Sequence, residues 1–124
     1  MQQDLNQVTE TIIGCAYTVA NTLGHGFLEK VYENALTHEL ANNGLQAKQQ
    51  VPIKVTYNGI CVGDYQADIL VNEAVLLEIK AQQNLTPAHV AQCMNYLKAT
   101  GHKICLLINF GKPRVEIKRV ILGY

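Results

Sequence analysis

Three residues near the middle of the chain have the types and spacing that chemistry on a phosphate group requires. Asp68 precedes the tripeptide Glu78-Ile79-Lys80 by ten residues. Two carboxylates held side by side repel each other, and a hard cation such as Mg²⁺ relieves this repulsion while keeping several of its waters. A bound ion would polarise a phosphoryl oxygen, and Lys80 would orient or deprotonate the attacking water. These are the parts that metal-dependent hydrolysis of a phosphodiester needs.

A β-hairpin must bring these residues together. Residues 66–71 and 75–81 read as two strands around the loop 72–74. Side chains alternate between the faces of a strand, so Glu78 and Lys80 share one face while the aliphatic side chains take the other. With a three-residue loop the register places Asp68 directly across from Glu78, on the same side of the sheet. A loop of two residues would break this geometry, because a one-residue slip changes the face.

Two helices are predicted before this hairpin. Apolar residues recur at three- and four-residue steps over residues 5–23, and Gly24 and Gly26 end the pattern. A second helix is predicted over residues 28–42, ending at Gly44. The period then changes to two over residues 50–57, and Asn58-Gly59 predicts a tight turn into a short strand over 60–62.

One more helix and two more strands are predicted after the hairpin. Thr86-Pro87 is typical of a helix start, and the helix runs to about Thr100, before Gly101. Residues 103–109 are an apolar buried strand, and an alternating strand follows over 114–122. The order ααβββ(β)αββ predicts one domain, residues 1–124, of the mixed α/β (α+β) class, with a mixed sheet flanked by helices.

Composition narrows the class of protein. No apolar run approaches about 18 residues, and the N-terminus lacks the plan of a signal peptide, so we expect a cytoplasmic protein that does not span a membrane. Four cysteines without metal-ligand spacing predict reduced thiols in the core. The net charge is zero, but six of the ten lysines and arginines lie in the last 27 residues. That basic region is equally consistent with attraction of phosphates and with an ordinary solvated strand face.

The sequence also resembles a known family. Asp68 followed by Glu78-Ile79-Lys80 resembles the signature of the PD-(D/E)xK nuclease superfamily, and Gly26-Phe27-Leu28-Glu29-Lys30-Val31-Tyr32 resembles the GxxExxY motif of a family placed within it. The resemblance extends from the first helix to Ile108-Asn109-Phe110-Gly111. It implies a restriction-endonuclease-like fold. Ala67 stands where the superfamily often has proline, and Gln66 stands where the GxxExxY family often has a basic residue.

The resemblance implies a role for each matching residue. Asp68, Glu78, Lys80 and Glu29 would be catalytic. The ligands of Mg²⁺ (or Mn²⁺) would be Asp68, Glu78, the carbonyl of Ile79, and Glu29. Substrate contact or support of the site would come from a second set, Gln92, Tyr96 and Tyr32.

Simpler interpretations stand beside these roles. Asp68 and Lys80 would make an ordinary cross-strand ion pair, and Glu29 with Glu33 would form a solvated helix face. Tyrosines of this kind are often core residues with a tethered hydroxyl, and a lone His89 on a helix is more often structural.

Three functions follow from these readings. The first is a Mg²⁺-dependent nuclease acting on DNA or RNA, the second a non-catalytic module that binds nucleic acid or protein on the same fold, and the third a structural subunit. A domain of 124 residues has little beyond a catalytic core, so a homodimer or a partner protein would supply any specificity.

Overall fold

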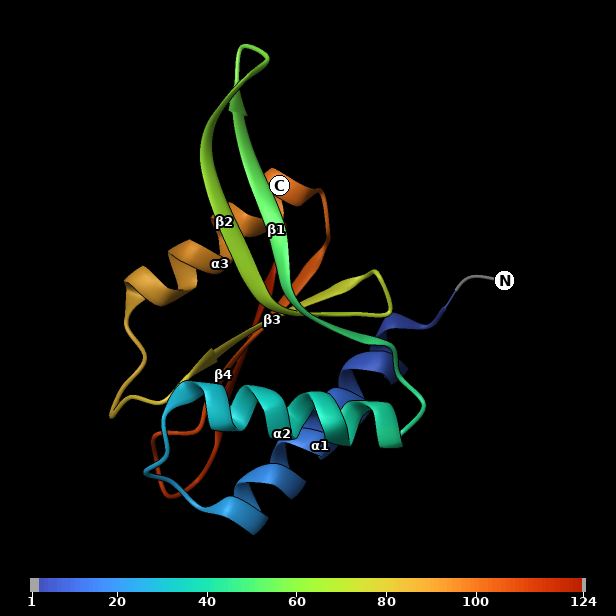
Figure 1. The fold of residues 1–124 in the computed structure, drawn as a ribbon, viewed down its shortest axis with the longest axis vertical. Coiled ribbons are helices and arrows are strands. Elements are labelled where there is room, and N and C mark those ends of the chain that lie inside the picture. The colour runs from blue at the N-terminus through green and yellow to red at the C-terminus, as the bar shows by residue number, and fades with distance from the viewer. Residues whose placement is uncertain (1–2, 124) are drawn as a thin grey trace.

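The first two helices form where the apolar stripes predict them. The structure is a computed structural model that describes residues 3–123. Helix α1 (Leu5–Leu23) begins at Asp4, whose carboxylate accepts hydrogen bonds from two backbone amides of the first turn. It ends at Gly24, which has a φ of +70°. Helix α2 (Glu29–Asn42) begins one residue later than predicted and packs against α1, as Figure 1 shows.

A five-stranded mixed sheet forms the centre of the molecule. Its strands lie in the order of the sequence. Strands β3 and β4 pair in parallel, whereas the other neighbouring strands pair antiparallel. The parallel pair needs a crossover, which the helix α3 (Pro87–Thr100) supplies. The strands are β1 (Ala47–Tyr57), β2 (Ile60–Val71), β3 (Val75–Lys80), β4 (Ile104–Asn109) and β5 (Glu116–Ile121).

Strand β2 corrects one prediction. The sequence indicated two short strands, over 60–62 and 66–71, whereas the structure has a single strand through Gly63 and Asp64. These two residues interrupt the apolar alternation, but backbone pairing with Lys54 and Val55 of β1 carries the strand across the gap. The observed order is therefore ααβββαββ, and the β1–β2 hairpin projects from the body of the molecule, as Figure 1 shows.

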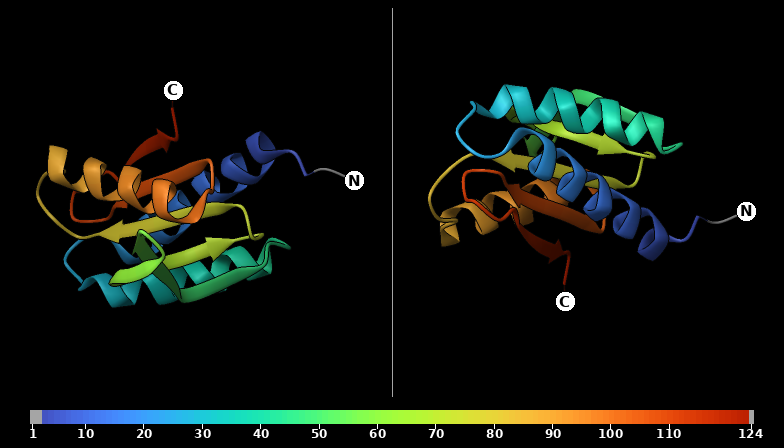
Figure 2. Two further views of the ribbon diagram at one scale, coloured as in Figure 1. Left: turned by 90° about the horizontal axis from the view of Figure 1, so that it is seen from above. Right: turned by 90° about the horizontal axis from the view of Figure 1, so that it is seen from below.

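Helices cover both faces of the sheet (Figure 2). Alternate residues of β3 divide between two hydrophobic clusters, so Val75, Leu77 and Ile79 pack with α1 and α2 while Leu76 packs with α3. Glu78 and Lys80 follow the parity of Leu76 and therefore belong to the α3 side. Glu78 and Lys80 thus lie opposite Val75, Leu77 and Ile79, as predicted, but they share their face with the buried Leu76.

The cysteines need a second correction. Cys15, Cys93 and Cys105 are buried, as predicted, but Cys61 is exposed because it lies in the projecting hairpin. All four thiols are free. Between residues 3 and 123, no helix combines the length and the apolar character that crossing a membrane requires.

Candidate active site

The β2–β3 hairpin brings Asp68 and Glu78 into contact. The turn has three residues, and the pairing Val71 with Val75 and Ile69 with Leu77 makes Asp68 and Glu78 the next opposed residues. The backbone amide of Asp68 donates to Glu78 Oε2 at 3.0 Å, and the amide of Ile79 donates to Asp68 Oδ2 at 2.7 Å. Each carboxylate is therefore held by the backbone of the opposite strand, and both are fixed in place before any ligand arrives.

The carbonyl of Ile79 faces the same side as these carboxylates. In a strand the N–H and C=O of one residue point to the same edge. The Ile79 amide points to Asp68, whereas the Lys80 carbonyl accepts from the Phe110 amide at 2.8 Å on the β4 side. The Ile79 carbonyl therefore points toward β2, the strand that carries Asp68.

Lys80 extends from the end of β3 toward α3. Its Nζ donates to Gln92 Oε1 at 3.3 Å, and Gln92 Nε2 donates to the Tyr96 hydroxyl at 3.1 Å. Among residues 3–123, Lys80 forms no ion pair with Asp68, so the simple cross-strand pair is not what the structure contains. The glutamine–tyrosine pair, which the helical spacing placed on one face, lies beside the lysine.

Burial makes the carboxylate pair hard to ionise fully. Glu78 is only 3% exposed, and burial, followed by the charge of Asp68, raises its pKa to about 8 against the attraction of Lys80. Burial also raises the pKa of Asp68, although the hydrogen bond from Ile79 opposes the shift. Near neutral pH the pair therefore holds a proton where a divalent cation would fit.

Glu33, on α2, influences the pKa values of Asp68 and Glu78, which the sequence did not indicate. Glu33 is 4% exposed and accepts hydrogen bonds from Lys30 Nζ at 3.0 Å, Gln49 Nε2 at 2.7 Å and Gln50 Nε2 at 3.0 Å. Its charge contributes to the raised pKa of both Asp68 and Glu78. The solvated-face interpretation is therefore wrong for Glu33. The signal was present, because Glu33 lies three and seven residues before the buried leucines of α2.

Glu29 lies one turn before Glu33 and is exposed. Its charge raises the pKa of Asp68 less than the charge of Glu33 does. A ligand or catalytic role for Glu29 stays a prediction.

The backbone opposite Asp68 has a rare conformation. Pairing of β1 with β2 passes from Gln49 with Ile69 to Val51 with Ala67 and leaves Gln50 and Asp68 out. Gln50 has a φ of +54°, a conformation that costs a residue other than glycine about 1–3 kcal/mol. In this conformation the Gln50 side chain donates to the Glu33 carboxylate. No sequence signal marked Gln50.

Tyr32 supports the strand end that carries Lys80. Its hydroxyl donates to the Gly24 carbonyl at 2.6 Å and accepts from the Phe27 amide at 3.2 Å. Its buried ring stacks on Phe110, with centroids 4.6 Å apart, and the Phe110 amide holds the Lys80 carbonyl. Tyr32 is thus a core residue with a tethered hydroxyl.

Asn109, which the sequence did not single out, fixes the chain just after the lysine. Its fully buried amide pairs with the backbone N–H and C=O of Gln82, both at 2.9 Å. Gly111 must be glycine here, because a Cβ would lie 2.2 Å from the Gln82 nitrogen. His89 has a structural task as well, because its Nδ1 accepts from the Thr86 amide at the start of α3.

The donor set suits a hard divalent cation. Within residues 3–123 no three His, Cys, Asp or Glu side chains gather as a ready ligand group. Mg²⁺, however, is commonly bound through one or two carboxylates and keeps several waters. Asp68, Glu78 and the Ile79 carbonyl offer that kind of set. Burial, followed by neighbouring carboxylates, raises the pKa of both Asp68 and Glu78, and a bound cation would favour their ionised forms.

Comparison with known proteins identifies the fold. Residues 6–120 match the family model described as the PD-(D/E)XK nuclease superfamily. No curated protein matches the sequence. The fold is similar to that of SSO0001, with a TM-score of 0.57 at 18% identity over 77% of this chain and 51% of that one. This chain thus spans about half the length of SSO0001.

A second likeness is to LHK-Exo, an alkaline exonuclease from Laribacter hongkongensis, with a TM-score of 0.56 at 15% identity over 99% of this chain and 73% of that one. LHK-Exo in complex with dAMP gives a TM-score of 0.53 at 14% identity over 93% and 83%. At such identities these likenesses concern the fold, and together with the family model they confirm the predicted mixed sheet flanked by helices.

Proposed function

The chain belongs to the PD-(D/E)XK nuclease superfamily, and from that premise we propose that it is a metal-dependent nuclease that hydrolyses phosphodiester bonds in DNA or RNA. One observation carries the proposal. Asp68 and Glu78 are opposed and locked by backbone amides at the position where Lys80 leaves the same strand. Folding gains nothing from placing two buried carboxylates together, so the arrangement points to a ligand.

Mg²⁺ or Mn²⁺ is the cofactor we propose, held by Asp68, Glu78 and the Ile79 carbonyl. When bound, it would polarise a phosphoryl oxygen and lower the pKa of a coordinated water. Lys80 would orient the attacking water and offset charge that develops on the phosphate. Gln92 would hold the Lys80 ammonium through its Oε1, and Tyr96 would orient Gln92 in turn. Glu29 stays a candidate for an outer contact to the metal.

A non-catalytic module that binds nucleic acid or protein on the same fold is the second candidate. One observation favours it, namely that residues 3–123 contain no group of three acidic, histidine or cysteine side chains ready to hold an ion. A weakly held ion would leave the fold able to bind but slow to cut.

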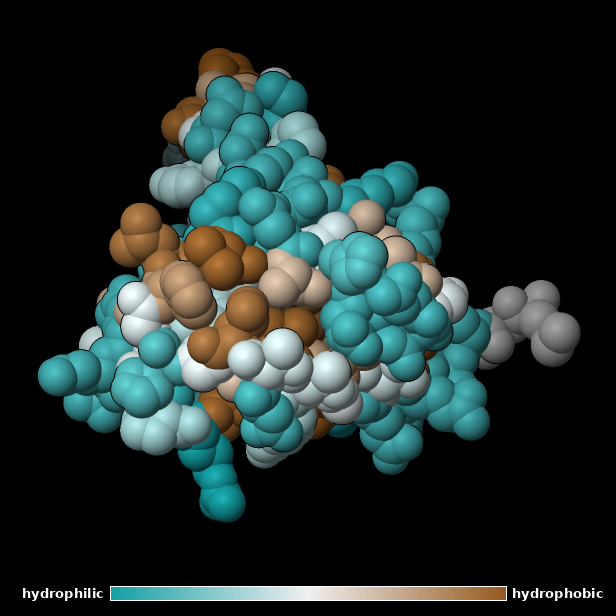
Figure 3. All heavy atoms as spheres, turned by 60° about the horizontal axis from the view of Figure 1, so that its bottom comes forward, coloured by the Kyte–Doolittle hydropathy of each residue, from teal (hydrophilic) through white to brown (hydrophobic). Residues whose placement is uncertain are grey.

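We further propose that the chain is a member of the GxxExxY family, because residues 26–32 match the motif of that family. We also propose that the protein works in the cytoplasm, where its four free cysteines would stay reduced. An exposed apolar surface of this protein is available for contact with a second copy or with a partner protein. Figure 3 shows hydrophobic side chains gathered on the side of the helices, and Phe27, Leu28 and Val31 are exposed at the start of α2.

A cleavage assay tests the proposed function. Labelled single- and double-stranded DNA and RNA are incubated with the protein in Mg²⁺, in Mn²⁺ and in EDTA. We expect cleavage that depends on metal and falls at least about 100-fold in Lys80→Ala, the usual effect of losing a group that acts on the proton.

Lys118→Ala, at an exposed lysine of β5, is the matched control and should cleave like the wild type. Cleavage that persists in EDTA or in Lys80→Ala would overturn the proposed mechanism. Binding of nucleic acid without cleavage in either metal would favour the non-catalytic module.

A further inference from the structure

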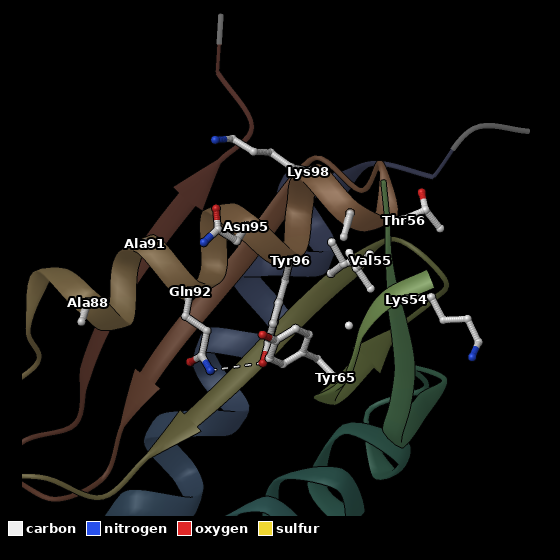
Figure 4. A pocket seen from close by; sticks show the side chains of 13 residues that line it. Lys54, Val55, Thr56, Tyr65, Ala88, Ala91, Gln92, Asn95, Tyr96 and Lys98 are labelled. Atoms are coloured by element: carbon white, nitrogen blue, oxygen red, sulfur yellow. Dashed lines mark hydrogen bonds between the residues drawn. The ribbon is translucent and has the colours of Figure 1, made fainter. Parts of the chain in front are cut away.

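A groove of about 860 Å³ lies between α3 and the projecting part of the β1–β2 hairpin (Figure 4). It is not centred on the two carboxylates but begins beside them. Gln92 and Tyr96 line it, and Gln92 also accepts the hydrogen bond from Lys80. A bound polymer with one phosphate at Lys80 could therefore continue along the protein surface into this groove.

The lining of the groove suits an anion. Among the described residues, Lys54 and Lys98 are the only charged side chains that line it, and no carboxylate does. Lys54 is bonded at 3.0 Å to Asp64, which lies outside the groove. Lys98 has no ion-pair partner among residues 3–123. Lys98 is therefore the cation left at the rim to attract a phosphate, although the protein as a whole has no net charge.

An aromatic ring is held in place within the groove. Tyr65 is 52% exposed, and its ring centroid lies 5.7 Å from that of Tyr96, at an angle of 48° (Figure 4). A Cβ at Gly63 would lie only 3.2 Å from Tyr65 Cε2, so the absence of a side chain there lets the ring lie close to the strand. Tyr65 is therefore ordered by neighbours on two sides while half of its surface stays open.

The size of the groove favours a single strand. Its volume lies in the range of pockets that hold one drug-sized ligand, so it would enclose only a few nucleotides of one strand. Single strands are commonly bound by a positively charged groove together with aromatic rings on which bases stack. Both features are present here.

We propose that this groove binds a single strand of nucleic acid next to the scissile phosphate, with a base stacked on Tyr65 and a phosphate near Lys98. The proposal rests on the proposed function, because it names the form of substrate for the same site. It makes Tyr65 a substrate-binding residue, a position that neither the carboxylate–lysine signature nor the GxxExxY motif contains.

The test measures binding without cleavage. Fluorescence anisotropy in EDTA follows single-stranded DNA and RNA probes of about 12 nucleotides, within the site size of single-strand-binding folds, and a duplex of the same sequence. We expect tighter binding of the single strands than of the duplex. Tyr65→Ala should weaken single-strand binding about 5- to 100-fold, the effect of losing one base–aromatic stack. Tyr65→Phe keeps the ring and should bind like the wild type.

Tyr57→Ala is the matched control, because Tyr57 is an exposed tyrosine of the same hairpin that does not line the groove. It should retain wild-type affinity. Lys98→Ala should weaken binding of both DNA and RNA and reduce its dependence on salt. Equal affinity of Tyr65→Ala and wild type for single strands, or an equal loss in Tyr57→Ala, would overturn the proposal.

The outcomes separate this proposal from the nuclease itself. Cleavage that depends on Lys80, together with binding that does not depend on Tyr65, would overturn the groove and leave the nuclease intact. Single-strand binding that depends on Tyr65, without any cleavage, would support the groove and overturn the nuclease.

Discussion

Replacing Glu78 by glutamine should make the metal-free protein more stable near neutral pH. The carboxyl group of Glu78 has an ordinary pKa of 4.5 and a pKa of about 8 in the folded protein. A group whose pKa is raised by folding contributes stability only while it is protonated. That contribution is fully present below about pH 4.5 and is lost as the pH rises through 8.

The magnitude follows from this shift. At about 1.4 kcal/mol per pH unit, the complete loss between the two pKa values is about 5 kcal/mol, of which about 3 kcal/mol has occurred by pH 7. Glutamine stays neutral and keeps an oxygen for the Asp68 amide. We therefore expect Glu78→Gln to match the wild type near pH 4 and to exceed its free energy of unfolding by up to about 3 kcal/mol at pH 7.

Urea denaturation in EDTA across this pH range provides the measurement. The difference between the two curves isolates Glu78, since the other titrating groups are common to both proteins. Asp68 retains its own raised pKa, so some dependence on pH should remain in the variant. Glu10→Gln, at an exposed acid of α1, should run parallel to the wild type.

Metal should reverse the order of stability. At a concentration about 1,000 times its dissociation constant, Mn²⁺ would add about 4.1 kcal/mol to the wild type, which exceeds the advantage of the variant, and much less to Glu78→Gln. The difference in unfolding free energy between Glu78→Gln and the wild type should grow from pH 4 to pH 7. A difference that stays constant, or that shifts in favour of the wild type, would show that the pKa of Glu78 is not raised by folding.

Four other substitutions test the surroundings of the pair. Glu33→Gln should lower the pKa of Glu78, because it removes a nearby negative charge. Glu29→Gln should change that pKa less. NMR titration of the Glu78 carboxyl carbon measures the pKa in each variant. Tyr32→Phe should cost about 1–3 kcal/mol of unfolding free energy in urea, because it removes a hydroxyl that makes two partly buried hydrogen bonds. Gly111→Ala should cost about 1–3 kcal/mol or more by the same measurement, because its Cβ would collide with the backbone after β3.

The carboxylate pair could be predicted from the sequence because local rules determine it. The alternation of β3 fixes which side chains share a face, and a three-residue turn fixes the register, so Asp68 and Glu78 had to meet. The Gly-flanked helix ends and the Thr86-Pro87 helix start were predictable for the same reason, since each depends on residues a few positions apart.

The rest of the site depends on contacts between distant segments. Glu33 is buried only because β1 brings Gln49 and Gln50 to its carboxylate, and the positive φ of Gln50 has no signature in the sequence. Gly63 stays within β2 because β1 pairs with it. The same hairpin carries Tyr65 to Tyr96, which is why the groove could not be predicted from either segment alone.

Calorimetric titration of Mn²⁺ into the metal-free protein at pH 7 shows whether Asp68 and Glu78 form a divalent-metal site. We expect the wild type to bind Mn²⁺ and to release protons, because Glu78 must lose its proton to bind the ion. Asp68→Asn should show no binding, while Asp64→Asn, at an exposed acid of the same strand, should bind like the wild type. Equal binding by wild type and Asp68→Asn, or no binding by the wild type, would rule out this metal site.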